Sequence, residues 1–86
     1  MPEISRFYGI VIAMYYGDHP PPHFHARYGS QRALVAIESS EVLRGRLSPR
    51  ALGLVREWAT LHRQELREDW ERARREEPLR PIAGLE

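Results

Sequence analysis

Three of the four histidines of this 86-residue chain fall within one short block that also holds an aspartate and an arginine. The block reads Asp18-His19-Pro20-Pro21-Pro22-His23-Phe24-His25-Ala26-Arg27-Tyr28. Side chains alternate along a strand, so His23, His25 and Arg27 share one face, and the apolar residues between them place this face away from the helix side of the sheet. Neutral imidazole is a common metal ligand, so His23 and His25 form a metal-binding fragment. Asp18 or His19 would supply a third ligand for a divalent metal ion.

The same block permits metal-free cleavage of RNA. One histidine would take the proton of the 2′-hydroxyl and a second would protonate the leaving oxygen, while Arg27 holds the phosphate. His19, His23, His25 and Arg27 are therefore candidate catalytic residues. A purely structural role is the alternative, in which the imidazoles hydrogen-bond backbone carbonyls and hold the proline segment against the sheet.

The composition narrows the chemistry further. The chain has no cysteine, which excludes disulfides, thiolate zinc sites and iron–sulfur clusters. All 13 basic residues are arginines, so chemistry that requires lysine is excluded. A net charge of +1 argues against a strongly basic nucleic-acid domain but leaves room for a local arginine patch. Apart from a divalent metal ion, the sequence predicts no cofactor.

The first half of the chain is rich in β-branched and aromatic residues, and the second half is rich in Leu, Ala, Glu and Arg. We expect strands over residues 6–16, 23–28 and 31–38, with a short fourth strand over 41–47. These patterns predict an α+β fold, in which an N-terminal antiparallel sheet of three to four strands packs against one long C-terminal helix.

That helix is expected to begin at Ser48-Pro49 and to continue to residue 77, because no breaker precedes Pro78. His62 falls inside its apolar arc, where a buried imidazole is more common than a ligand. Residues 1–77 would form a single domain and residues 78–86 an extended tail. No apolar run approaches the ~20 residues of a membrane span, and the N-terminus lacks a signal-peptide pattern, so we expect a cytoplasmic protein without membrane association.

A line of arginines follows the predicted helix. At 100° per residue, Arg56, Arg63, Arg67 and Arg74 fall within about 40° of one another. Such a line fits an acidic partner protein or a phosphate backbone, and a solvated, salt-bridged face is the alternative. Trp70 lies on the late turns, where the sheet is expected to run out, and is a candidate partner contact.

Three segments carry a resemblance to a known family. They are the N-terminal Pro-Glu-Ile-Ser-Arg-Phe-Tyr-Gly-Ile-Val-Ile, the Met-Tyr-Tyr-Gly-Asp-His-Pro-Pro-Pro-His-Phe-His-Ala-Arg-Tyr-Gly block, and the helix segments Glu-Trp-Ala and Leu-His-Arg. Over residues 2 to about 78 the chain resembles domain of unknown function family 4160. The family pattern matches His19, His23, His25, Arg27, Tyr28, Trp58, His62 and Trp70.

The resemblance implies a small prokaryotic protein whose gene lies beside that of another small protein, in arrangements like toxin–antitoxin modules. We therefore expect a toxin-like or partner-binding component that docks a cognate protein encoded nearby. The alternative is a small histidine-dependent nuclease or hydrolase, or a metal-binding protein, built on His19, His23, His25 and Arg27, with RNA as a candidate partner. The residues do not specify an oligomeric state.

Overall fold

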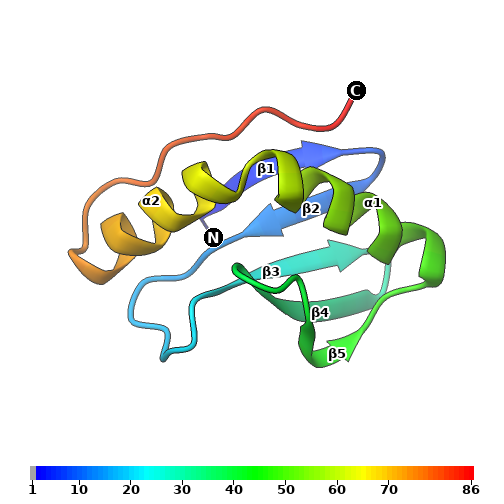
Figure 1. Ribbon diagram of the computed structural model, residues 1–86, viewed down its shortest axis with the longest axis horizontal. Helices are drawn as coiled ribbons and strands as arrows, with labels where there is room; N and C mark the ends of the chain where they lie inside the picture. The colour runs from blue at the N-terminus through cyan, green and yellow to red at the C-terminus, as the bar shows by residue number, and fades with distance from the viewer. Residues whose placement is uncertain (1) are drawn as a thin grey trace.

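A five-stranded antiparallel sheet forms one layer of the molecule, and two helices cover one of its faces (Figure 1). The structure is a computed structural model that describes residues 2–86. The strands are β1 (Glu3–Phe7), β2 (Ile10–Ala13), β3 (His23–Tyr28), β4 (Gln31–Ala36) and β5 (Val42–Arg46), and they are ordered β1-β2-β3-β4-β5. The helices are α1 (Pro49–Leu61) and α2 (Arg63–Arg74). The expected α+β class with an N-terminal antiparallel sheet is confirmed.

The number of strands differs from the expectation because residues 6–16 do not form one strand. Tyr8 and Gly9 have φ angles of 50° and 80° and make a two-residue turn between β1 and β2. Turns with positive φ at both central residues match the right-handed twist of paired strands, so they close tight hairpins. The sheet therefore has five strands rather than three to four.

The expected single long helix is also interrupted. Pro49 occupies its first turn, and the Ser48 hydroxyl accepts a hydrogen bond from the Ala51 amide at 3.3 Å. The interruption falls at His62, with φ of −117° and ψ of 25°. Two residues earlier, the Thr60 hydroxyl donates to the Arg56 carbonyl at 2.9 Å, a contact that bends helices because it competes for a helix carbonyl. The result is two helices joined by one residue.

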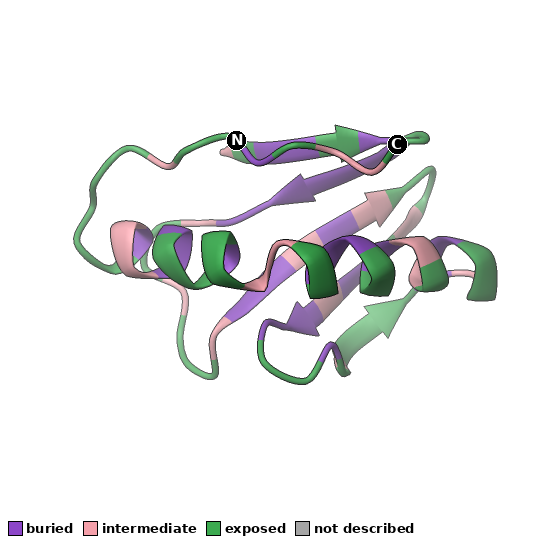
Figure 2. Cartoon of the chain, turned by 45° about the horizontal axis from the view of Figure 1, so that its top comes forward, coloured by how far each residue is buried: buried purple, intermediate pink, exposed green. Residues whose placement is uncertain are grey.

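The core lies between the sheet and the helices (Figure 2). Ile12 and Phe24 project from neighbouring strands toward α1 and are fully buried. The Trp58 indole lies among them, with its ring centroid 5.4 Å from that of Phe7 and 5.7 Å from that of Phe24. Within residues 2–86 no helix covers the opposite side of the sheet, which we call the open face. The sheet thus has one packed face and one face available for other contacts.

Residues 78–86, expected to be an extended tail, contain no helix or strand and lie along β1 and the helices (Figure 1). The Ile82 amide donates to the Ile4 carbonyl at 2.7 Å, and the Trp58 indole donates to the Ala83 carbonyl at 2.8 Å. Ile82 is buried in the same core as the sheet residues. These contacts attach the tail to the domain.

Among the described residues, neither helix has the length and apolar character required to cross a bilayer.

Candidate functional site

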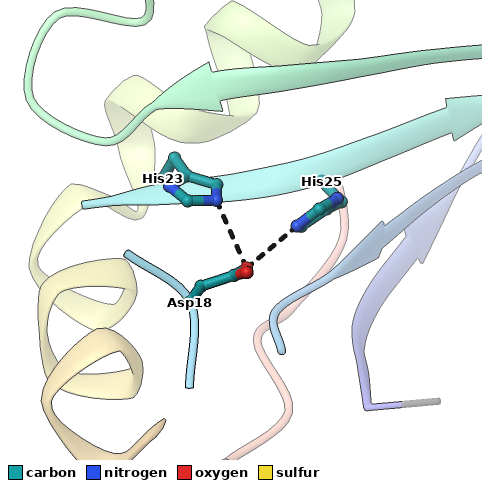
Figure 3. Close-up of side chains that lie close together, drawn as sticks. All are labelled: Asp18, His23 and His25. Atoms are coloured by element: carbon teal, nitrogen blue, oxygen red, sulfur yellow. Dashed lines mark hydrogen bonds and ion pairs between the residues drawn. The ribbon is translucent and has the colours of Figure 1, made fainter. Parts of the chain in front are cut away.

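Three side chains from the histidine block converge at the start of β3 (Figure 3). Asp18 comes from the connection between β2 and β3, and His23 and His25 lie on β3 itself. Asp18 Oδ2 lies 3.2 Å from His23 Nε2 and 3.1 Å from His25 Nε2. One ligand atom from each of the three residues lies within 4.8 Å of the other two. The structure therefore brings together the three residues considered as metal ligands.

The surroundings of His23 fix the orientation of its ring. His23 Nδ1 lies 2.8 Å from the Pro21 carbonyl oxygen. A carbonyl can only accept, so Nδ1 must carry a proton. In the neutral ring Nε2 then presents a lone pair to the Asp18 oxygen, which is also an acceptor. Two acceptors at this distance require a proton or a cation between them.

Packing holds both imidazoles in place. The His23 ring is buried, with its centroid 5.3 Å from that of Trp70 on α2. We had expected His23 to point away from the helices; instead it contacts α2, because it is the first residue of β3, where the chain enters the sheet. The His25 ring meets the Tyr15 ring edge-on at 4.5 Å. The side chains of Asp18 and His25 keep 30% and 29% of their exposure, so water reaches the cluster.

The dimensions and partners of this cluster suit a divalent transition-metal ion. Metal bonds to imidazole nitrogen and carboxylate oxygen are about 2.0–2.2 Å long, so neighbouring ligand atoms lie roughly 3.0–3.5 Å apart. The two distances from Asp18 to the histidines fall in this range. The bond from His23 Nδ1 to a backbone carbonyl is the outer contact that metal-binding histidines usually make.

The remaining residues of the predicted histidine site lie elsewhere. His19 is exposed and is not part of the cluster. Arg27 lies two residues beyond His25 on β3, and its side chain lies on the open face of the sheet. His62 lies at the junction of the helices, where its ring packs against Trp58 and Nδ1 pairs with Glu65. His62 therefore belongs to the helix junction and not to the cluster.

The four helix arginines considered as a docking surface all have partners within the chain. Arg56 donates to the Ser40 carbonyl at 3.0 Å, and Arg63 donates to the Ile37 carbonyl at 3.0 Å. Arg67 forms two hydrogen bonds with Glu38, at 2.6 and 2.7 Å. These contacts attach the helices to the connection between β4 and β5.

The fourth helix arginine, Arg74, and the candidate partner contact Trp70 are also engaged within the molecule. Arg74 pairs with Glu71 at 3.1 Å on the surface of α2. Trp70 is only 5% exposed, so its indole lies in the core and packs against His23 instead of standing free at the end of the sheet.

The Arg67 contact also changes the acid–base behaviour of its partner. The hydrogen bonds from Arg67 lower the pKa of Glu38 from its ordinary value of 4.5, and the nearby charges of Arg67 and Arg63 add to this effect. The same interaction raises the pKa of Arg67. The charged pair is thus favoured in the folded chain.

Three exposed arginines, Arg32, Arg44 and Arg46, lie on the open face beside the predicted site residue Arg27, and local sequence pattern did not indicate them. Arg32 on β4 pairs directly with Arg27 on β3 and with Arg46 on β5. Arg44 lies two residues before Arg46 and shares its face. The alternation of side chains along residues 31–36 and the Arg-Gly-Arg spacing of β5 place each arginine on one face of its own strand. Only the pairing of the strands shows that these arginines lie side by side.

Comparison with known proteins gives one match. A family model described as a domain of unknown function, DUF4160, matches residues 9–71. This range contains the whole cluster and Arg27, Arg32, Arg44 and Arg46 of the open face. No curated protein and no solved structure matches the chain.

Proposed function

This chain belongs to the DUF4160 family of domains of unknown function, and we propose that it is a metal-dependent hydrolase whose ion is held by Asp18, His23 and His25. The observation that carries the proposal is the Asp18 oxygen shared between two imidazoles, one of which has its tautomer set by the Pro21 carbonyl. A divalent ion would occupy the position that these three acceptors surround.

Three protein ligands leave room for water on the ion. Zinc is commonly four-coordinate, and other divalent transition metals accept up to six ligands. A metal-bound water loses a proton far more readily than bulk water and becomes a nucleophile near neutral pH. The exposed sides of Asp18 and His25 give substrate and water access to such a position.

Arg27 provides the second component of a hydrolytic site. Two residues along a strand span about 7 Å, so the Arg27 side chain leaves the sheet close to His25 on the same face. A guanidinium at that place would stabilise negative charge that develops on a phosphate or carboxylate substrate. This arrangement supports hydrolysis of an anionic substrate more than simple storage of a metal ion.

The proposal is tested by metal titration of the purified chain. We expect one Co²⁺ or Zn²⁺ ion per chain, measured by calorimetry and by the Co²⁺ absorption spectrum. His25→Ala and Asp18→Ala should weaken binding by at least about 10- to 100-fold, the loss typical even of outer contacts to a metal ligand. His19→Ala is the matched control, because His19 lies in the same block and outside the cluster.

Hydrolysis is tested separately. Metal-loaded protein should hydrolyse bis-p-nitrophenyl phosphate, with the activity lost in His25→Ala and retained in His19→Ala. Binding should weaken on acidification, since metal ligands must be deprotonated. Absence of a stoichiometric metal ion in the wild type, or equal binding by the wild type and by Asp18→Ala plus His25→Ala, would refute the proposal.

The family resemblance favours another role, in which the chain docks a cognate protein encoded nearby as part of a toxin–antitoxin-type module. The helix arginines offered for this role are already hydrogen-bonded within the chain. We therefore rank docking through this helix face below the metal site. Co-expression with the product of the neighbouring gene, followed by purification, would reveal such a complex.

A further inference from the structure

The open face of the sheet carries a continuous row of side chains from all five strands. Strand pairing places Arg6 opposite Val11, Val11 opposite Arg27, Arg27 opposite Arg32, and Arg32 opposite Arg46. We call the four arginines of this row the arginine row. A second row runs beside it in the order Glu3, Ala13, His25, Leu34 and Arg44.

Most of the positive charge on this face has no acidic partner. Within residues 2–86, Arg27, Arg32, Arg44 and Arg46 form no ion pair with a carboxylate. Glu3 is the one acidic residue of the two rows, and it pairs with Arg6 at 2.8 Å. Four arginines without a carboxylate partner in the described chain therefore share this face. The helix arginines described above instead donate hydrogen bonds to carbonyl or carboxylate oxygens.

Such an arrangement works against the fold and therefore points to a ligand. Like charges directly opposite one another on neighbouring strands are destabilising. Arg27, Arg32 and Arg46 occupy directly opposite positions on three successive strands, about 4.8 Å apart. An anion with several regularly spaced charges would relieve the repulsion along the whole row.

A hollow beside the row indicates that this anion also carries flat apolar groups. It is lined by Val11, Ala13, Tyr15, His25, Arg27 and Arg32. An apolar floor with a tyrosine at one side suits the stacking of an unpaired base, and the guanidinium groups at the other side suit phosphates. A peptide of acidic residues alone, such as polyglutamate, has charges but no flat groups to fill such a hollow.

The width of the face argues against a duplex. Four gaps between five strands span roughly 19 Å, whereas the major groove of B-DNA is about 12 Å wide. Sheet faces that bind unpaired strands instead spread the bases over the sheet and stack them on aromatic side chains. The open face offers such an exposed sheet, with Tyr15 as the aromatic side chain beside its hollow.

We propose that the open face binds a single-stranded nucleic acid, with phosphates on the arginine row and one base against Tyr15. This surface is distinct from the metal ligands, except that His25 borders both. Binding does not require the metal ion, so the two proposals can fail independently.

The test is fluorescence anisotropy with a labelled 12-nucleotide oligouridylate, in EDTA, between 50 and 200 mM salt. Each arginine that neutralises a phosphate contributes about 0.7 to the slope of log affinity against log salt. Arg32→Ala plus Arg46→Ala should therefore lower the slope by about 1.4 and weaken binding roughly tenfold or more at 100 mM salt. Circular dichroism would verify that the variant is folded.

Arg67→Ala plus Arg74→Ala is the control, because it removes the same charge from the helix side. It should change the affinity by less than about twofold and leave the slope unchanged. Tyr15→Ala should weaken binding by roughly 5- to 150-fold without changing the slope, since stacking does not release counterions.

Several results would overturn the proposal. These are no binding at 50 mM salt, an equal loss in the control variant, unchanged affinity of Tyr15→Ala, tighter binding of a 12-base-pair duplex, or displacement by polyglutamate as efficient as by unlabelled RNA. Retained binding in EDTA with no metal uptake would remove the metal proposal and leave this one intact.

Discussion

Asp69→Ala is expected to destabilise the fold more than most single substitutions. The Asp69 side chain is fully buried in α2. Its Oδ1 atom accepts a hydrogen bond from Arg72 Nη1 at 2.9 Å and another from the Arg80 amide at 2.9 Å. Asp69 therefore connects α2 to the C-terminal tail. Alanine leaves the Arg80 amide without its acceptor and leaves Arg72 only the longer contact with Glu68, at 4.0 Å.

The size of the effect follows from these two contacts. A hydrogen bond to a charged group contributes about 1.5–3 kcal/mol, and loss of one partner of a buried ion pair costs about 3–5 kcal/mol. Arg72 keeps 19% of its side-chain exposure, so we expect the lower part of that range, about 3 kcal/mol. For a domain of this size, that loss lowers Tm by roughly 12–24 °C.

Urea denaturation followed by tryptophan fluorescence, with thermal melts by circular dichroism, measures the change. Glu71→Ala is the matched control, because the Glu71 pair with Arg74 is exposed, and it should cost no more than about 0.5 kcal/mol. Asp69→Asn keeps an acceptor for the Arg80 amide and should fall between the two. A loss below about 1 kcal/mol for Asp69→Ala, or one equal to that of the control, would refute the reasoning.

Two further predictions concern the sheet and its contact with the helices. Gly45→Ala should destabilise by at least about 2 kcal/mol in urea denaturation, because Gly45 has φ of +82° and a Cβ there would lie 2.2 Å from the Arg32 carbonyl oxygen. Gly53→Ala, in an open helical position, should instead stabilise by roughly 1 kcal/mol, and equal effects would contradict this account. Arg67→Ala should raise the pKa of Glu38 toward 4.5, as measured by carboxyl NMR titration. Since the pKa of Glu38 is lower in the folded chain, the contribution of this pair to stability is present above pH 4.5 and is lost as the pH falls through the folded pKa. An unchanged Glu38 titration in Arg67→Ala would show that Arg67 is not the cause of the lowered pKa.

Strand positions were largely accessible from the sequence, and the failures have local causes. The strand over 23–28 was predicted with its observed bounds, because proline and glycine limit the alternating segment on both sides. The hairpin at Tyr8-Gly9 was missed because the turn lies inside an apolar run, and a tyrosine with positive φ is not a common turn residue. The break at His62 was missed because none of its neighbours is a proline or glycine.

For the arginines, the sequence predicted positions along the helix but not the contacts that the side chains make in the fold. Helical periodicity correctly placed Arg56, Arg63 and Arg67 along one side of the helices. It could not show that the connection between β4 and β5 would supply their acceptors, since that depends on how the chain returns to the helices. Arg32 and Arg46, in contrast, were not predicted as a binding surface. They are 14 residues apart in the sequence and become neighbours only through the strand register. Tertiary contacts, and not local pattern, decide which arginines are free.

The path of the tail beside β1 also determines how the sheet can meet other chains. An open sheet exposes two edge strands whose free amides and carbonyls can pair with another molecule and seed aggregates. At β1, the Ile82 amide already occupies the Ile4 carbonyl, and a Cβ at Gly84 would come within 2.8 Å of the Arg6 carbonyl. At β5, an irregular register and two arginines discourage pairing instead. One edge is therefore shielded by the chain itself and the other by charge, so self-association through strand addition is opposed at both ends of the sheet.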